Sequence, residues 1–381
     1  MLFRRKSLEE KEEKFLAPYA VKSGKSRGRH HKDVPDNERL AFQRDKDRIV
    51  HCKAFRRLDE KTQVFMAGSG DHYRTRLTHT LEVAQISRDL ARRLGLNEDL
   101  AESIALAHDL GHPPFGHGGE EALSNVMKPF GLYFEHNEQS RRVVEKLEKL
   151  YPNFDGLNLT FEVLEGMIKH QTAFDQAGKE FEVFSHLEAQ IVNIGDEIAY
   201  TNHDMDDGIR SGIITVKQLR KFALWKQGEE IVGKHYGKKL DEDILVSRVV
   251  SAITSLMIDD LCRQTEKNLK KFKIGSLKDV AKHKGILASF SLEMLAMIKE
   301  LRKFLYDNFY MHPDVYGFVL QGERMIKKLF EFYLKNPKEF PRKKFLEQED
   351  DLVVEVKDYI AGMTDGFLMG EFQKYFGKSR R

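Results

Sequence analysis

Apolar side chains recur at a helical period along most of this chain, and this periodicity limits the folds that the chain can adopt. In the segment 76–94, Leu77, Leu81 and Leu94 follow the period, and Gly95 is placed to end the helix. Further helical patterns cover 185–204, 216–233, 242–272, 287–309, 317–335 and 350–376. Alternating β-branched stretches are few, and the chain has only nine prolines. We therefore predict an all-α protein.

Composition excludes several other classes of protein. The formal net charge is only +3 over 381 residues, so bulk charge predicts no nucleic-acid partner. Two cysteines provide neither a disulfide framework nor a CxxC metal site, which fits a reducing cytoplasm. No apolar run approaches the roughly 18 residues that a membrane helix needs. We expect a cytoplasmic protein without membrane contact.

The stretch IALAHDLGHPPFGHGGEEAL, residues 104–123, combines a helix with a cluster of titratable side chains. Asn97 is a good N-cap for this helix, and the apolar stripe that includes Ile104 continues onto His108. A single buried histidine is most often a satisfied core residue. The adjacent Asp109 is harder to explain, because a buried carboxylate is costly unless it is paired or binds a cation.

Two other predicted helices carry polar side chains that interrupt a regular apolar pattern, His79 in 76–94 and Asp196 in 185–204. A mixed set of histidines and carboxylates suits a divalent ion such as Mn²⁺, Mg²⁺, Co²⁺, Ni²⁺ or Fe²⁺. A metal site that draws its ligands from three helices would explain all of these interruptions.

Five stretches together resemble a known family. They are DRIVHCKAFRRLDEKTQVF (47–65), RLTHTLEVAQI (76–86), HDLGHPPFGHGGE (108–120), GDEIAYTNHDMDDGI (195–209) and DYIAGMTD (358–365). The chain resembles the deoxyguanosine triphosphate triphosphohydrolase-like branch of the HD-domain phosphohydrolases over residues 38–376. The resemblance implies an HD-domain helical fold with an extra N-terminal arm and C-terminal helices. It also implies four metal ligands, which are His79, His108, Asp109 and Asp196.

The same resemblance assigns the residues that face the triphosphate, which are His112, His117, Glu120 and His136. Gly111, Pro113 and Pro114 would end the helix and turn the chain toward the open side of the metal. Glu120 would orient His117 and so let this histidine protonate the leaving 5′-oxygen. The simpler alternative is that His117 caps a helix at the surface. Arg76 corresponds to a phosphate-contacting arginine, with an ordinary ion pair as its alternative.

Contacts to the sugar, the base and the terminal phosphate are implied for five further residues: Gln63, Tyr200, Asp204, Tyr310 and Arg302. Tyr200 would stack under the sugar and reject a 2′-hydroxyl by its bulk. Lys303 competes with Arg302 for the terminal phosphate. At position 311 this chain has a methionine where some relatives have a polar side chain. His170 is a weaker candidate for a residue that supports the metal ligands.

Three regions are expected along the chain. Residues 1–60 would form a basic N-terminal arm and a first helix, and 61–215 would form the metal-dependent core. Residues 216–381 would form a helical region that packs on the core and completes the substrate pocket. Basic clusters in the arm suit phosphates of a deoxynucleoside triphosphate (dNTP) effector or of single-stranded nucleic acid, or else a solvated tail. By analogy with relatives we expect a tetramer or hexamer.

The predicted activity is hydrolysis of dGTP, and of other dNTPs if the pocket admits them, to deoxynucleoside and tripolyphosphate. Activation by a dNTP effector is part of this expectation. One alternative is another HD-type phosphohydrolase or phosphodiesterase that acts on nucleoside monophosphates or cyclic nucleotides. A second alternative is a nucleotide-sensing or single-stranded nucleic-acid-binding protein with little turnover.

Overall fold

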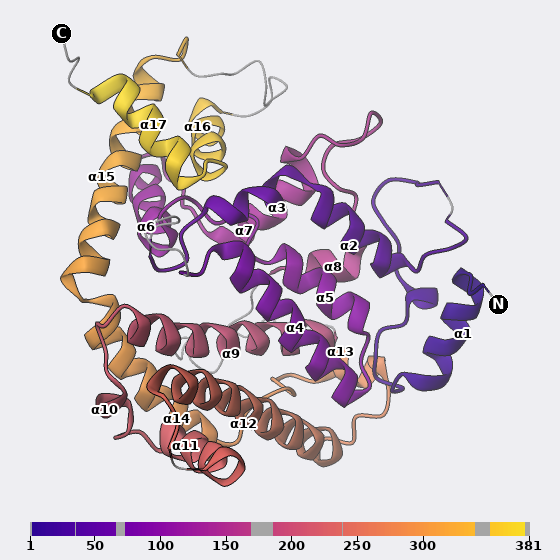
Figure 1. The fold of residues 1–381 in the computed structure, drawn as a ribbon. Helices are drawn as coiled ribbons and strands as arrows, with labels where there is room; N and C mark the ends of the chain where they lie inside the picture. Colours follow the sequence, from indigo (N-terminus) through magenta and orange to yellow (C-terminus); the bar gives the residue numbers. More distant parts are fainter. Residues whose placement is uncertain are drawn as a thin grey trace.

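The computed structural model describes residues 2–34, 36–65, 73–168, 186–237, 239–339 and 351–377. Within these ranges the chain forms helices and isolated β-bridges but no strand, so the predicted all-α class is confirmed (Figure 1). The α-helices are α1 (Arg5–Phe15), α2 (Ala41–His51), α3 (Lys53–Arg57), α4 (Arg76–Leu94), α5 (Glu98–Ala107), α6 (Gly116–Met127), α7 (His136–Arg142), α8 (Phe161–Gly166), α9 (Leu187–Arg210), α10 (Val216–Leu219), α11 (Ala223–Tyr236), α12 (Glu242–Lys271), α13 (Leu277–Lys282), α14 (Leu292–Leu305), α15 (Pro313–Lys335), α16 (Leu352–Ala361) and α17 (Asp365–Phe376). Short 3-10 turns lie at Ser23–Lys25, Leu58–Glu60 and Lys128–Phe130, and π-helical turns lie at Val143–Leu147 and Tyr306–Tyr310.

Helices α4, α5 and α9 pack against one another in the centre of the molecule (Figure 1). Leu90, Ile104 and Ile198, one from each of these helices, are fully buried in the same large apolar cluster. Helix α2 covers α5, and α12 packs on both α9 and α11. Burial of the shared apolar face holds the three central helices in a fixed arrangement, and these helices carry or immediately precede the predicted metal ligands.

A second apolar cluster joins α6 to the C-terminal helices. Leu123 of α6, Ile326 of α15 and Val356 of α16 are fully buried within it. Helix α15 runs along one side of the molecule, from the lower helices to the α16–α17 pair at the top of Figure 1. Helices from the C-terminal part of the chain therefore hold α6, which carries His117 at its start, in place.

Helix ends in the core follow their sequence signals. Thr75 accepts a hydrogen bond from the amide of Thr78 and caps α4, which ends at Gly95 in the left-handed region with φ 70°. Asn97 accepts from the amide of Leu100 and caps α5. The predicted bounds of α4 and the predicted start of α5 are confirmed, because side-chain caps and a left-handed glycine act locally. Helix α5 ends at Ala107, before the predicted break at Gly111, so His108 is its C-cap residue and Asp109 lies beyond the helix.

The helix predicted over 185–204 needs correction, because it extends to Arg210, and Ser185 lies outside the described residues. The stretch 266–285 contains the last turns of α12 and all of α13. Residues 1–40 contain α1, which has no buried side chain.

The N-terminal arm lies on the body of the protein. Val21 is buried, and its amide donates to Glu188 of α9 at 3.0 Å. Arg29 forms a buried ion pair with Asp45, and Arg27 pairs with Glu165 at 2.5 Å. These basic side chains are thus engaged by carboxylates of the same chain. No described helix is long and apolar enough to cross a membrane.

Candidate active site

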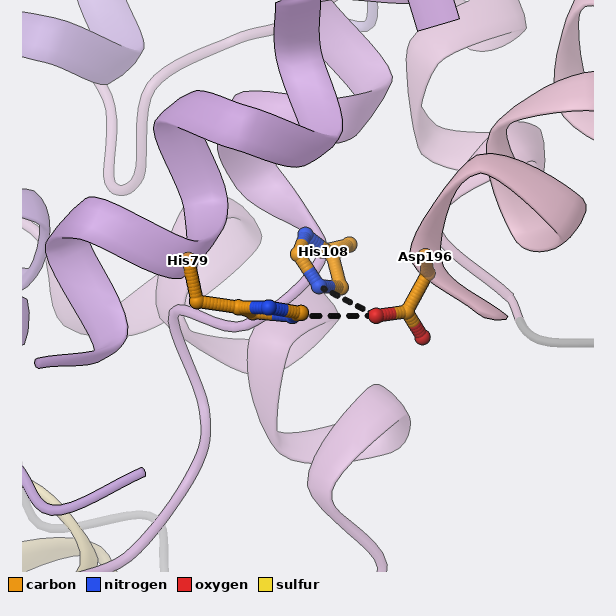
Figure 2. Close-up of side chains that lie close together, drawn as sticks. All are labelled: His79, His108 and Asp196. Atoms are coloured by element: carbon orange, nitrogen blue, oxygen red, sulfur yellow. Dashed lines mark hydrogen bonds and ion pairs between the residues drawn. The ribbon is translucent and has the colours of Figure 1, made fainter. Parts of the chain in front are cut away.

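His79, His108 and Asp196 point toward one another at the centre of the α4–α5–α9 layer (Figure 2). The Nε2 atom of His79 lies 3.0 Å from Oδ1 of Asp196, and Nε2 of His108 lies 3.7 Å from the same oxygen. One ligand atom from each of the three side chains falls within 4.8 Å of the others, a spacing that could hold a metal ion. Three helices therefore deliver three of the four predicted ligands to one place.

The fourth predicted ligand, Asp109, borders this group. Its Oδ1 lies 3.2 Å from Nε2 of His108, and its Oδ2 lies 4.0 Å from Nε2 of His79 and 2.8 Å from Arg76. Burial favours the neutral acid, but His108 and Arg76 outweigh this effect and lower the pKa of Asp109 below its usual value. The carboxylate is therefore ionised, as a metal ligand must be.

The hydrogen bonding of His108 fits a metal ligand. Its Nδ1 lies 2.6 Å from the carbonyl oxygen of Ala105, to which it donates its proton. Its Nε2 is buried and has no hydrogen-bond partner among the described residues. Burial lowers the pKa of His108, which keeps the ring neutral. A neutral imidazole with an unused lone pair facing two carboxylates is chemically suited to a divalent cation.

The sharp turn after Asp109 is possible because of close backbone packing. The amide of Gly111 donates to Oγ of Ser140 in α7 at 2.8 Å, and a Cβ at Gly111 would lie 2.1 Å from the amide nitrogen of Ser140. Position 119 must also be glycine, because a Cβ added there would lie 1.8 Å from the carbonyl oxygen of Pro114. The glycine and proline residues of this stretch thus allow the chain to reverse between α5 and α6.

The turn brings the predicted phosphate-facing histidines together. The rings of His112 and His136 stack with centroids 4.0 Å apart, and His117 meets His112 edge-on at 5.9 Å. Glu120 lies 2.9 Å from Nδ1 of His136 and 3.8 Å from Nδ1 of His117. Burial would raise the pKa of Glu120, but the neighbouring His117 and the hydrogen bonds from His136 hold the pKa below its usual value.

A cavity of about 710 Å³ opens beside this cluster. All five predicted substrate contacts line it together with His117, namely Gln63, Tyr200, Asp204, Tyr310 and Arg302. Lys299 and Lys303 add positive charge to the α14 side, while Glu121 and Glu323 lie elsewhere on the wall. The cavity has the size of a small-molecule site and links the histidine cluster to the residues expected to contact the sugar.

Two tyrosines and an aspartic acid form one wall of this cavity. The Tyr310 hydroxyl lies 2.9 and 2.8 Å from the two carboxylate oxygens of Asp204, and its ring stacks on Tyr200. The guanidinium of Arg302 lies 5.4 Å from the centroid of the Tyr200 ring. Burial raises the pKa of Asp204 well above its ordinary value, so this carboxyl can hold a proton and donate to a hydroxyl.

Several residues at the site had not been predicted from the sequence. Lys61 is buried and donates to the carbonyl oxygens of His112 and Ala361, and Asp365 accepts from the amides of Thr62 and Phe115. Both lie within stretches that resemble the family, KTQVF and DYIAGMTD, and this resemblance was the available signal. Glu82 and His203 lie behind His79 and were not singled out. His170 lies outside the described residues.

A helical layer that gathers histidines and carboxylates at its centre, beside a cavity with cationic side chains, defines a metal-dependent phosphohydrolase of the HD type. The HD domain model matches residues 76–201, and the phosphohydrolase-associated domain model matches residues 288–374. The first match contains all four predicted metal ligands. The second contains α14 and α15, which line the cavity, and reaches into α17.

Curated proteins extend the similarity to almost the whole chain. A deoxyguanosinetriphosphate triphosphohydrolase-like protein of Geobacter sulfurreducens is 50% identical over 369 residues, 95% of each chain. Similarly named proteins of Geobacter metallireducens and Leptospira interrogans are 46% and 44% identical, over 95% and 96% of this chain and 95% and 98% of theirs. The chain belongs to the family of HD-domain deoxyguanosinetriphosphate triphosphohydrolase-like proteins.

Proposed function

We propose that this protein hydrolyses dGTP, and other dNTPs that its pocket admits, to deoxynucleoside and tripolyphosphate. The observation that carries the proposal is the single cavity lined by His117 and by every residue expected to contact the sugar, the base or the terminal phosphate. A nucleotide in this cavity would have its phosphates near the histidine cluster and the α14 cations. The names of the relatives agree with this substrate class.

We assign the metal ligands as His79, His108, Asp109 and Asp196, for one of Mn²⁺, Mg²⁺, Co²⁺, Ni²⁺ or Fe²⁺. When bound, such an ion would polarise the α-phosphate and lower the pKa of the attacking water. Arg76 lies beside Asp109 with a buried Nε that has no partner among the described residues, so its guanidinium can bind a phosphate oxygen.

His117 is the proposed general acid. Water attacks the α-phosphorus, and the bond from this phosphorus to the 5′-oxygen breaks. His117 gives its proton to the departing 5′-oxygen, because it alone of the three neighbouring histidines is largely exposed toward the cavity, with 66% of its side chain accessible. Glu120 orients His117 and His136, while His112 packs against both of these rings.

Sugar recognition is assigned to Gln63, Tyr200, Asp204 and Tyr310. The buried Oε1 of Gln63 has no partner among the described residues, and the Asp204–Tyr310 pair presents hydroxyl and carboxyl groups to the same cavity. These groups can bind a 3′-hydroxyl, while the stacked tyrosines restrict the space for a 2′-hydroxyl. Arg302, with Lys299 and Lys303 beside it, is assigned to the triphosphate.

We further propose the three regions 1–60, 61–215 and 216–381, a homo-oligomeric state and a cytoplasmic location. The pairing of Arg27 and Arg29 with carboxylates of the body favours a structural role for the arm over a nucleic-acid-binding role. A dNTP effector remains part of the proposal and is tested together with the activity.

The test is a product assay with purified protein and Mn²⁺, using each dNTP alone and then all four together. Deoxynucleoside plus tripolyphosphate from one dNTP alone would establish the reaction and its base preference. The same products only from the mixture would show that a dNTP effector is required. Stepwise release to dNDP and dNMP, or no turnover with metal bound, would overturn the proposal in favour of another phosphoester substrate or a sensing protein.

A further inference from the structure

A hydrogen-bonded chain extends from His79 away from the cavity. The Nδ1 atom of His79 lies 3.1 Å from Nδ1 of His203, and Nε2 of His203 bonds to the carboxylate of Glu82. Both imidazoles are almost fully buried, at 2% and 3% side-chain exposure. The chain thus joins a proposed metal ligand on α4 to a histidine on α9 and returns to a carboxylate on α4.

The positions of the protons in this chain follow from the chemistry of its members. A carboxylate can only accept, so Nε2 of His203 must carry a proton. The two facing Nδ1 atoms, 3.1 Å apart, share one proton. Nε2 of His79 faces Asp196 and His108 as the proposed ligand atom and must keep its lone pair for the ion, so the proton lies on Nδ1 of His79, and Nδ1 of His203 accepts the hydrogen bond.

Arg74 holds the outer end of this chain in place. Its guanidinium contacts Glu82 at 3.4 Å, Asp206 at 2.9 Å and Asp207 at 2.7 Å. Burial would raise the pKa of Glu82, but the hydrogen bond from His203 and the charge of Arg74 hold it at about 2. Glu82 consequently remains an acceptor at neutral pH, although 42% of its side chain is exposed.

We infer that Glu82 and His203 are positioning residues that fix His79 in the Nδ1–H tautomer and thereby set the affinity of the metal centre. The inference rests on the proposed assignment of His79 as a metal ligand. Partners of this kind orient the imidazole and increase its basicity, and their loss typically lowers metal affinity about 10- to 100-fold. A purely structural role would require only that the buried nitrogens be hydrogen-bonded in some way.

Two substitutions at position 203 separate these roles. The amide oxygen of Asn occupies the place of Nδ1, so His203→Asn keeps an acceptor for His79 but loses the bond to Glu82. The amide nitrogen of Gln occupies the place of Nε2, so His203→Gln keeps the bond to Glu82 but loses the acceptor. Both side chains are polar amides, so neither has a general advantage in this buried position.

The experiment is calorimetric titration of metal-free full-length protein with Mn²⁺, with thermal unfolding of each variant as a check on folding. We expect His203→Gln to weaken Mn²⁺ binding about 10- to 100-fold, and His203→Asn to stay within about threefold of wild type, because it keeps the bond that selects the tautomer. Glu82→Ala should also weaken binding, because His203 without this acceptor can carry its proton on Nδ1 instead and then no longer accepts from His79, whereas the amide oxygen of Asn can only accept. Asp89→Ala, a change to another partly exposed carboxylate on α4, should not.

His79→Ala distinguishes failure of this inference from failure of the proposed metal site. Equal Mn²⁺ affinity in wild type, Glu82→Ala and both position-203 variants, with affinity lost in His79→Ala, would overturn the positioning role alone. Unchanged affinity in His79→Ala would overturn the metal assignment and this inference together. Equal weakening by His203→Asn and His203→Gln would show a structural role and would also overturn the inference.

Discussion

Three histidines that look equivalent in the sequence occupy different environments in the structure. His112 and His136 are stacked and mostly buried, with 4% and 14% of their side chains exposed, whereas His117 opens to the cavity. Burial and the charge of Arg76 keep the pKa of His112 well below its ordinary value, so His112 is a poor proton donor. We therefore propose His117, and not His112, as the proton donor.

We expect His117→Gln to lower kcat about 10²- to 10⁴-fold, the range of general acid catalysis, because the leaving oxygen would depart unprotonated. Mn²⁺ affinity should not change, since His117 does not belong to the group formed by His79, His108 and Asp196. Steady-state kinetics and metal titration measure the two quantities. A variant with normal kcat would remove His117 from the reaction.

At the scale of elements, the reversal between α5 and α6 depends on contacts with segments that are distant in the chain. Helix α7 packs against Gly111, and Asp365 at the start of α17 receives hydrogen bonds from Thr62 and Phe115. Contacts with α7 and with Asp365 therefore hold the turn and the start of α6 in place. The positions of the proposed metal ligands before the turn and of His117 after it depend on these contacts.

Gly111→Ala should destabilise the protein by at least about 3 kcal/mol, because relief of the clash requires α7 to move and disrupts packing. Gly233→Ala in α11 is the matched control, since nothing lies within 4 Å of a Cβ at that position. The control should gain about 0.5–1 kcal/mol from helix propensity. Equal unfolding free energies of the two variants in urea would contradict this explanation of the turn.

Asp365→Ala should cost about 2–4 kcal/mol, because two amides and the Thr62 hydroxyl lose a buried acceptor. It should also reduce kcat, since Gln63 and the start of α6, which carries His117, would be less well positioned. Asp365→Asn, which keeps an acceptor oxygen, should be milder on both measures. If Asp365→Ala lost stability but retained full kcat, Asp365 would have no role in positioning the site.

Helix positions could be predicted where the determining signal is local. Thr75, Gly95 and Asn97 act within one turn of their own helix ends, so the bounds of α4 and the start of α5 follow from sequence. The Glu82–His203 pair could not be predicted, because it depends on the rotation of α9 relative to α4. The four expected metal ligands and the pocket residues were predicted from the resemblance to a family. From periodicity alone, His79 and Asp196 would have been interpreted as ordinary polar residues that interrupt an apolar pattern.

The arm and the body form one packed unit at the scale of the whole molecule. Asp45 is fully buried and is paired with Arg29, whose side chain is 9% exposed. In contrast, Arg39 pairs with Asp47 at the surface, where 52% of the arginine side chain is exposed. Both arginines belong to the predicted N-terminal arm, yet only Arg29 is enclosed by the body.

Arg29→Ala should destabilise the protein by about 3–5 kcal/mol, because it leaves a buried carboxylate without its cation. Arg39→Ala should cost no more than about 1 kcal/mol, the usual range for an exposed ion pair. Equilibrium unfolding of both variants measures the difference. Similar small losses would mean that the arm contributes little to the stability of the body and is available for other partners.

The most direct test of the proposed reaction is ³¹P NMR of products formed from dGTP and Mn²⁺ in ¹⁸O-labelled water. Attack of water on the α-phosphorus with cleavage of its bond to the 5′-oxygen predicts tripolyphosphate with one ¹⁸O on a terminal phosphorus, and unlabelled deoxyguanosine. Label in dGMP with release of pyrophosphate, or label in orthophosphate with formation of dGDP, would contradict the proposed function.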